Sequence, residues 1–310
     1  MNIGEALRIV FGELPDLPFL PELPARGPGA DLIGRGAGLL VDFPVHLYAG
    51  DWRVTTRPGL DARRTADLWE RDLDALSEQA AGYAGALKVQ AAGPWTLAAS
   101  LGLPLGSAVL RDPGAVRDLT GSLAEGLTQH VREVARRVPG ATVVLQLDEP
   151  SLPAVLAGHV PTESGFGTLR VVTESVARAA LSQVIEAVGV PVVVHCCAAD
   201  VPVGLLREAG AAGIALDLSL GPALDPLGEA IDAGVRLFVG VVPAVGAPPP
   251  AKQVAASVQE LWHKLGFPTA LLFDRVVVTP TCGQAGASPG DALAALATCR
   301  EAARRLRDAD

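Results

Sequence analysis

One histidine and two cysteines have the residue types and the spacing to hold a metal ion. His195 and Cys197 are two positions apart and follow the β-branched run Val190 to Val194. Cys282 follows a second such run, Val276 to Thr279. Side chains two positions apart in a strand point to the same face, so His195 and Cys197 can act together. One imidazole nitrogen and two sulfurs form a ligand set that suits Zn²⁺ and leaves one coordination position open.

The same residues also have an ordinary structural interpretation. Cysteine is among the most buried residue types, and His195 could be a core histidine with satisfied hydrogen bonds. Both cysteines, however, stand at strand ends and are followed by small residues, which favours the metal site. Cys196 points to the opposite strand face and is expected to take no part in it.

Acidic side chains stand where packing alone does not explain them. Asp148 and Glu149 follow the apolar run Thr142 to Leu147, and an unpaired buried charge is costly. Asp148 could bind a substrate ammonium group, whereas Glu149 fits better as the N-cap of the next helix. Glu22 similarly projects from an apolar strand end. A zinc ion beside two carboxylates suits an amino-acid thiol, because the amine of such a ligand is cationic.

Strand-like and helix-like segments that position these residues alternate along the whole chain. The expected strands are residues 18–22, 86–90, 142–147, 190–194, 213–218, 236–241 and 275–279. The expected helices include residues 63–82, 115–137, 174–188, 251–265 and 291–308. Repeated parallel βαβ units predict an α/β fold, a (β/α)₈ TIM barrel, with functional side chains at the carboxyl ends of its strands. A doubly wound sheet would carry a glycine-rich fingerprint after its first strand, and none is present. Without repeats or a linker, residues 1–310 are expected to form a single barrel domain.

Seven strands can be recognised, although a closed barrel needs eight. The first begins at Pro18, after the helix-like segment Ile3 to Phe11. Either the first strand is irregular or the native chain begins upstream of Met1, and the sequence leaves both open. Leu39 to Arg57 is expected to form an extended hairpin or a long loop over one end of the barrel.

Composition excludes several classes of partner. The net charge is −9 and no Lys/Arg cluster occurs, which argues against nucleic acid and against an anionic membrane surface. We find no signal-peptide pattern and no apolar stretch of about 18 residues. Four cysteines, two of them adjacent, do not make a disulfide framework, so reduced thiols and a cytoplasmic location are expected.

Three motifs together resemble the catalytic barrel of cobalamin-independent methionine synthases. In order along the chain they are Gln146-Leu147-Asp148-Glu149-Pro150-Ser151-Leu152, His195-Cys196-Cys197 and Pro280-Thr281-Cys282-Gly283. Gly93-Pro94-Trp95-Thr96-Leu97 also looks like the Gly-Pro-x-Thr turn of that family. The resemblance covers essentially the whole chain, and the wider superfamily shares its fold with uroporphyrinogen decarboxylase.

The resemblance implies a (β/α)₈ barrel in which a His, two Cys and a Glu hold zinc. His195, Cys197 and Cys282 match zinc ligands, while Asp148 and Glu22 match the acids that hold the homocysteine amino group. Bound zinc would keep the homocysteine sulfur as a thiolate near neutral pH and present it to a methyl donor. The chain is therefore expected to be a zinc-dependent methyltransferase that makes methionine from homocysteine, or that acts on a related small thiol.

Several features of the family have no counterpart in this sequence. The fourth ligand, a Glu, falls near Ser219, and Asp217 on the same strand face is the candidate to replace it. The Ile-Gly-Ser segment of the first strand is missing, and the tryptophan that stacks on folate would lie near Ser100. Val241-Val242-Pro243-Ala244 replaces the Asp-x-His after the seventh strand. The thiol half of the site is thus mostly kept and the folate half is not, so the donor could be a methyl-folate or a methylated corrinoid.

Two other functions stay open from the sequence. A uroporphyrinogen decarboxylase-like enzyme would need arginines to bind propionates, and Arg26, Arg35 and Arg53 are available. The histidine and the two cysteines would then have no role. A non-catalytic barrel that stores zinc or binds a thiol would keep the metal site and lack a donor pocket.

Overall fold

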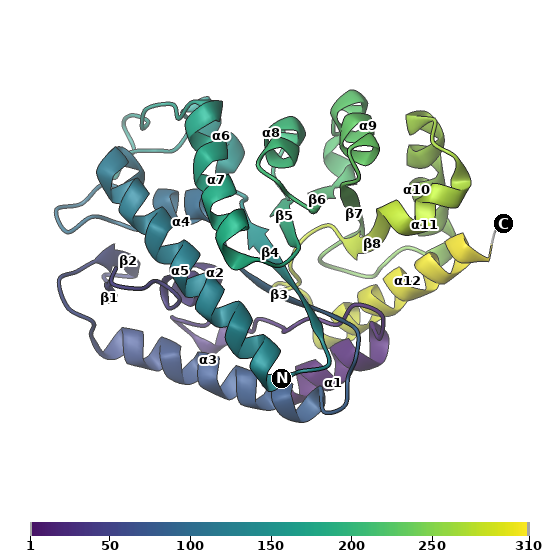
Figure 1. Ribbon diagram of the computed structural model, residues 1–310, viewed down its shortest axis with the longest axis horizontal. Coiled ribbons are helices and arrows are strands. Elements are labelled where there is room, and N and C mark those ends of the chain that lie inside the picture. The colour runs from purple at the N-terminus through teal and green to yellow at the C-terminus, as the bar shows by residue number, and fades with distance from the viewer. Residues whose placement is uncertain (1, 309–310) are drawn as a thin grey trace.

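The computed structural model describes residues 2–308, in which a parallel sheet is wrapped by helices (Figure 1). Six strands lie in the order β3-β4-β5-β6-β7-β8, each parallel to its neighbour. Their bounds are β3 Ala86–Ala92, β4 Thr142–Asp148, β5 Val192–Cys196, β6 Gly213–Asp217, β7 Arg236–Val242 and β8 Val276–Pro280. Every strand end lies within two residues of the end predicted from the β-branched runs, so six of the seven predicted strands are observed.

The strand predicted at residues 18–22 is present only as a single bridge. Phe19 pairs in parallel with Lys88, and the amide of Leu20 donates to the Lys88 carbonyl at 3.0 Å. The side chain of Gln90 then donates to the Leu20 carbonyl at 2.7 Å, where a longer ladder would use a backbone amide. The six strands curl into a half-barrel, which this bridge extends at the β3 edge. No strand among residues 2–308 fills the gap between β8 and Phe19, so the complete eight-stranded barrel is observed only in part.

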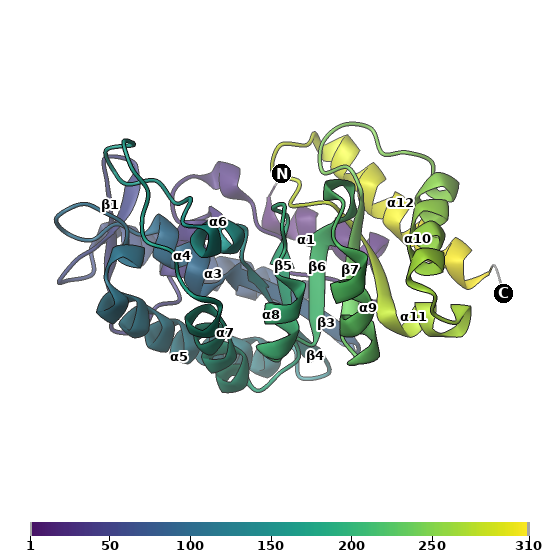
Figure 2. The ribbon, with the colours of Figure 1, turned by 90° about the horizontal axis from the view of Figure 1, so that it is seen from above.

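Helices cover the outside of the strands and follow one another around them (Figures 1 and 2). In chain order they are α1 Ile3–Glu13, α3 Leu60–Gln79, α5 Pro113–Arg137, α7 Glu174–Val188, α8 Val203–Glu208, α9 Leu224–Asp232, α10 Ala251–Leu265 and α12 Pro289–Arg307. Each of these packs on the next, and α1 contacts both α3 and α12. The helix layer therefore closes around the molecule where the strand layer does not.

Short elements occupy the connections. They are α2 Leu32–Ala37, α4 Pro94–Ser100, α6 Leu152–Ala157 and α11 Leu272–Arg275, with the 3₁₀ turns η1 Pro24–Arg26, η2 Val109–Arg111, η3 Leu218–Leu220 and η4 Thr269–Leu271. No helix within residues 2–308 is long and apolar enough to cross a membrane.

Of the two possibilities expected for Leu39 to Arg57, an extended hairpin or a long loop, the structure shows the hairpin. Strands β1 Val45–Tyr48 and β2 Asp51–Val54 pair in antiparallel fashion. Ala49 and Gly50 between them have φ values of 52° and 97°, as a two-residue hairpin turn of the primed type requires.

Alternate side chains of the strands separate two environments. The outward residues, such as Leu145, Val194 and Leu216, pack under the helices in the main core. The inward residues Val193 and Phe238 belong to a small separate apolar cluster. Nearer the carboxyl ends of the strands the interior becomes polar, with the side chains of Gln90, Gln146, Asp148 and His195. This polar end is where a parallel α/β barrel places its functional groups.

Candidate metal centre

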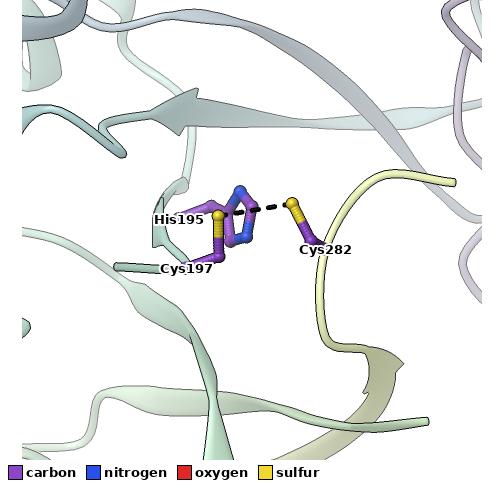
Figure 3. A group of neighbouring side chains, drawn as sticks. All are labelled: His195, Cys197 and Cys282. Atoms are coloured by element: carbon purple, nitrogen blue, oxygen red, sulfur yellow. Dashed lines mark hydrogen bonds between the residues drawn. The ribbon is translucent and has the colours of Figure 1, made fainter. Parts of the chain in front are cut away.

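His195, Cys197 and Cys282 converge at the carboxyl ends of β5 and β8 (Figure 3). One ligand atom from each residue lies within 4.8 Å of the other two. The sulfurs of Cys197 and Cys282 are 3.3 Å apart and share a hydrogen bond. The structure thus brings together the three side chains that the sequence pattern singled out. Cys196 faces the other way and is fully buried, and burial raises the pKa of its thiol to about 11.

The position of Cys282 depends on a close approach of two backbone segments. A Cβ atom at Gly240 would lie 2.8 Å from the Cα of Thr281 and 2.7 Å from the Leu216 carbonyl oxygen, so a larger residue would collide with both. The amide of Thr281 donates to the Val242 carbonyl at 2.8 Å. The absence of a side chain at Gly240 therefore lets residue 281, and with it Cys282, reach the centre.

Asp148 fixes the imidazole ring of His195. The two residues are register partners on β4 and β5, and His195 Nδ1 is 2.8 Å from Asp148 Oδ1. That same oxygen accepts a hydrogen bond from Gln146 Nε2 at 2.7 Å. Burial disfavours the charged imidazole, but the hydrogen bond to Asp148 and the charges of Asp148 and Cys282 together outweigh burial and raise the pKa of His195. With Nδ1 held by a carboxylate, Nε2 is left for a metal, an arrangement common among metal-binding histidines.

The two cysteines do not titrate alike. The hydrogen bond between the two sulfurs, aided by the nearby His195, lowers the pKa of the Cys282 thiol to about 6. The same hydrogen bond, together with burial, raises the pKa of Cys197. The pair therefore favours one thiolate, Cys282, and one protonated sulfur, Cys197, near neutral pH. A metal ion that binds both sulfurs would have to displace the remaining proton.

Glu22 is mostly buried and near enough to Asp148 for the two charges to interact. Its Oε1 is 3.3 Å from the Nε of Arg35, and 19% of the side chain is exposed. Burial raises the pKa of Glu22 to about 7, against the pull of Arg35, and the charge of Asp148 raises it further. The two acids thus influence each other in one part of the interior. Their binding of an ammonium group stays a prediction.

Asp217 and Ser219 are joined by hydrogen bonds at the carboxyl end of β6. Asp217 Oδ1 accepts hydrogen bonds from the Ser219 amide at 2.8 Å and from the Ser219 hydroxyl at 2.6 Å, which caps η3. Among residues 2–308, the group of converging metal-ligand atoms contains His195, Cys197 and Cys282 but not Asp217. The role of Asp217 as a fourth ligand therefore stays a prediction.

Glu149 caps a helix, but the expectation that it caps the next one was wrong. Its carboxylate accepts hydrogen bonds from the amides of Trp95 and Thr96 and from the Thr96 hydroxyl, at 3.0, 2.7 and 2.8 Å. Those groups begin α4, which precedes Glu149 in the chain. A Cβ at Gly93 would lie 2.5 Å from the Glu149 carboxyl carbon, so this turn requires glycine. The Gly-Pro-x-Thr turn thus donates the hydrogen bonds that the buried Glu149 carboxylate accepts.

Two polar residues, Gln146 and Asp72, join the site through Asp148 and Arg35 without being predicted from the sequence. For Gln146 a signal exists, because its spacing from Asp148 places both on one strand face. Asp72 bonds Arg26 and Arg35 from a separate helix, and no spacing signal in the sequence connects them.

The fold and the site together define an α/β barrel-like protein with a candidate soft-metal centre. The model of the family described as cobalamin-independent synthase, catalytic domain, matches residues 23–305. The chain therefore belongs to the cobalamin-independent methionine synthase catalytic-domain family, which has the TIM-barrel fold.

One similar solved structure is a B12-independent methionine synthase from Shewanella sp. W3-18-1 in complex with selenomethionine. It matches with a TM-score of 0.56 and 17% identity, over 84% of this chain and 71% of that one. At this identity the similarity shows the fold alone. None of the curated proteins matches the chain.

Proposed function

We propose that this protein is a zinc-dependent methyltransferase that moves a methyl group to the thiol of homocysteine, giving methionine. The observation that carries the proposal is the convergence of His195, Cys197 and Cys282 within 4.8 Å in a chain of this family. Zinc–sulfur and zinc–nitrogen bonds of about 2.3 and 2.0 Å place the ligand atoms of a tetrahedral ion roughly 3.5 Å apart. The donor set and its spacing therefore fit zinc with one position left for a substrate.

The chain's own residues would orient and select the substrate. When bound, zinc supplies a positive charge that keeps a thiol ionised near neutral pH. Asp148 holds the ring of His195 through Oδ1, and both of its hydrogen bonds use that one oxygen. Its Oδ2 therefore remains available to the ammonium group of an amino-acid thiol. Glu22 would supply the second negative charge.

Methyl transfer would form a bond between the methyl carbon and the homocysteine sulfur. The bond from that carbon to the donor breaks, and the leaving atom of the donor keeps the electron pair. The donor would be a methyl-folate or a methylated corrinoid. Ser100 and the segment 241–244 lack the aromatic and acidic side chains expected of a folate site, which supports testing both classes.

The arginines that a uroporphyrinogen decarboxylase-like enzyme would use are engaged elsewhere. Arg26 and Arg35 both pair with Asp72, at 2.6 Å in each case. Arg53 pairs with Glu163 at 3.1 Å. Because each already faces a carboxylate, binding of substrate propionates is disfavoured.

A methyl-transfer assay with zinc-loaded protein tests the proposal. Homocysteine is supplied with methyltetrahydrofolate, as the mono- and triglutamate, or with methylcobalamin. Each donor carries the label in its methyl group. We expect label in methionine with at least one donor, and its loss in Cys197→Ser. Zinc and homocysteine binding without transfer from any donor would support the non-catalytic barrel instead. Failure to bind either ligand would contradict both functions.

A further inference from the structure

Arg35 on α2 is a buried cation that contacts Glu22 and that the proposed reaction does not use. We propose that Arg35 is a positioning residue that holds the Glu22 carboxylate in place for a substrate ammonium group. In this role Arg35 sets the preference for amino-acid thiols over simple thiols. The inference rests on the proposed function, because that function supplies the class of ligand.

Arg35 is held rigidly at both ends. Its side chain is 1% exposed, and Nη1 lies 2.6 Å from an oxygen of Asp72, which is fully buried. The guanidinium carbon lies 3.7 Å from the centre of the Trp69 ring. The indole nitrogen of Trp69 in turn donates to the backbone carbonyl of Arg35 at 3.2 Å. A side chain fixed in this way can hold Glu22 in one place at little further cost in entropy.

The charges of this group balance only when Glu22 is ionised. Asp72 is shared by two guanidiniums, those of Arg35 and Arg26, and Arg26 contacts both of its oxygens at 2.6 and 2.8 Å. One positive charge is therefore left over in a buried place, which is costly without a partner. Glu22, 3.3 Å from Arg35, is the acid that supplies the partner. His130, which packs on Trp69, adds no cation near neutral pH, because burial and Arg35 lower its pKa to about 4.

The incomplete part of the network is its Glu22 end. Oε1 of Glu22 and the Nε and Nη2 atoms of Arg35 are buried without a hydrogen bond, whereas the contacts of Asp72 are complete. Unsatisfied buried groups are costly and uncommon, so their concentration here calls for an explanation. The side chain of Glu22 is 19% exposed, and Glu22 is near enough to Asp148 for the two charges to interact. A ligand ammonium group that reaches both acids would pair with the Glu22 carboxylate.

Lys88 cannot replace Arg35 in this role. Its ammonium group lies 5.0 Å from the centre of the Phe19 ring and 3.5 Å from Gln90 Oε1. It forms no ion pair with any acid in the described part of the chain. Burial lowers the pKa of Lys88, which weakens it further as a partner for Glu22. Arg35 is thus the cation in contact with Glu22.

A double-mutant cycle on the zinc-loaded full chain tests the inference. Isothermal titration measures the Kd of homocysteine, and of 4-mercaptobutyrate, which lacks the amino group, for the parent, Glu22→Gln, Arg35→Met and the double variant. We expect homocysteine to bind at least about tenfold more weakly to Glu22→Gln and at least about fivefold more weakly to Arg35→Met. Because the two residues act as a unit, the double variant should bind about as weakly as Glu22→Gln alone. Binding of 4-mercaptobutyrate should stay within about twofold throughout.

Arg26→Met is the comparison variant, since it removes the surplus positive charge on Asp72 but keeps the Arg35 guanidinium in contact with Glu22. It should weaken homocysteine binding by less than Arg35→Met does, and an equal or larger loss would overturn the role of the Arg35 contact. Arg35→Gln, which keeps donors for Asp72, replaces Arg35→Met if that variant does not fold, and Arg35→Lys should recover most of the affinity. Additive losses in the double variant, or parent-like binding by a folded neutral variant of Arg35, would overturn the inference. If the parent itself binds no homocysteine, the proposed function fails; if only the Arg35 variants behave like the parent, the inference fails alone.

Discussion

Among the single residues, Asp148 has two predicted roles. Its Oδ1 bonds His195, and the family resemblance implies that Asp148 also binds the ammonium group of the substrate. A substitution at Asp148 therefore acts on the metal and on the substrate together. Glu22 forms no hydrogen bond or ion pair with the three candidate metal ligands, all of which lie in the described part of the chain, so it isolates substrate recognition.

Asp148→Asn should weaken zinc binding about 10- to 100-fold, because an amide replaces the carboxylate that orients and polarises the metal-binding histidine. Homocysteine should also bind at least tenfold more weakly, because the neutral amide loses the charge pair with the ligand ammonium group. A tenfold change in Kd corresponds to about 1.4 kcal/mol. Competition with a chromophoric chelator gives the zinc affinity. Unchanged zinc affinity in this variant would show that Asp148 does not support the metal ligand.

Homocysteine binding should strengthen as the pH rises through about 7. The pKa of Glu22 is raised to about 7 by burial, so the carboxyl is neutral below this value and attracts an ammonium group only above it. The amine of the ligand stays protonated to about pH 8. The measurement is the ratio of the Kd values of 4-mercaptobutyrate and homocysteine between about pH 6 and pH 7.5. A ratio independent of pH in the parent, or a rise that persists in Glu22→Gln, would contradict this role of Glu22.

The meeting of His195, Cys197 and Cys282 could be predicted because strand periodicity and parallel topology fix which ends of strands converge. Pairings between helices and loops carry no such period. The cap of α4 by Glu149 and the contact of Arg35 with Glu22 join segments whose spacing in sequence says nothing about distance. These contacts became visible only in the folded chain.

At the scale of elements, the approach of β7 to the segment after β8 controls the position of Cys282. Gly240→Ala should weaken zinc binding at least about tenfold without removing a ligand, because its Cβ would push Thr281 away. Gly283→Ala is the matched control, since nothing lies within 4 Å of a Cβ built there. Chelator competition measures both variants. Equal zinc affinity in the two would show that Cys282 does not depend on this contact.

The N-terminus of α4 depends on a carboxylate from another element. Glu149→Ala should lower the free energy of unfolding by about 3 kcal/mol or more, because it leaves two buried amides and a hydroxyl without an acceptor. Urea denaturation measures this loss. Glu186→Ala, at an exposed position of α7, should change stability by no more than about 0.5 kcal/mol. A loss at Glu149 as small as that of the control would mean that the cap contributes little.

Six strands and the β1–β2 hairpin could be predicted because β-branched runs and turn residues are local signals. The strand at 18–22 is shorter than predicted because the Gln90 side chain takes the Leu20 carbonyl that would extend the ladder. A competition of this kind between a side chain and the backbone cannot be read from a hydrophobic pattern.

At the scale of the whole molecule, helices close a layer that the strands leave open. The contacts of α1 with both α3 and α12 join the two ends of the half-barrel. The sequence indicated the alternation of elements but not this closure, which depends on packing between distant helices. Cys197 and Cys282 follow strands separated by β6 and β7, so a metal ion held by both would link the middle of the sheet to its β8 edge.

The zinc content of the purified full chain shows whether His195, Cys197 and Cys282 form a metal site. Elemental analysis of protein prepared without chelator should find about one zinc per chain in the parent and in Cys196→Ala, whose side chain lies on the opposite strand face. It should find almost none in the folded Cys197→Ser/Cys282→Ser variant, which keeps a single ligand of the three. Stoichiometric zinc in that double variant, or a parent that takes up no zinc when it is supplied, would show that these residues do not hold zinc.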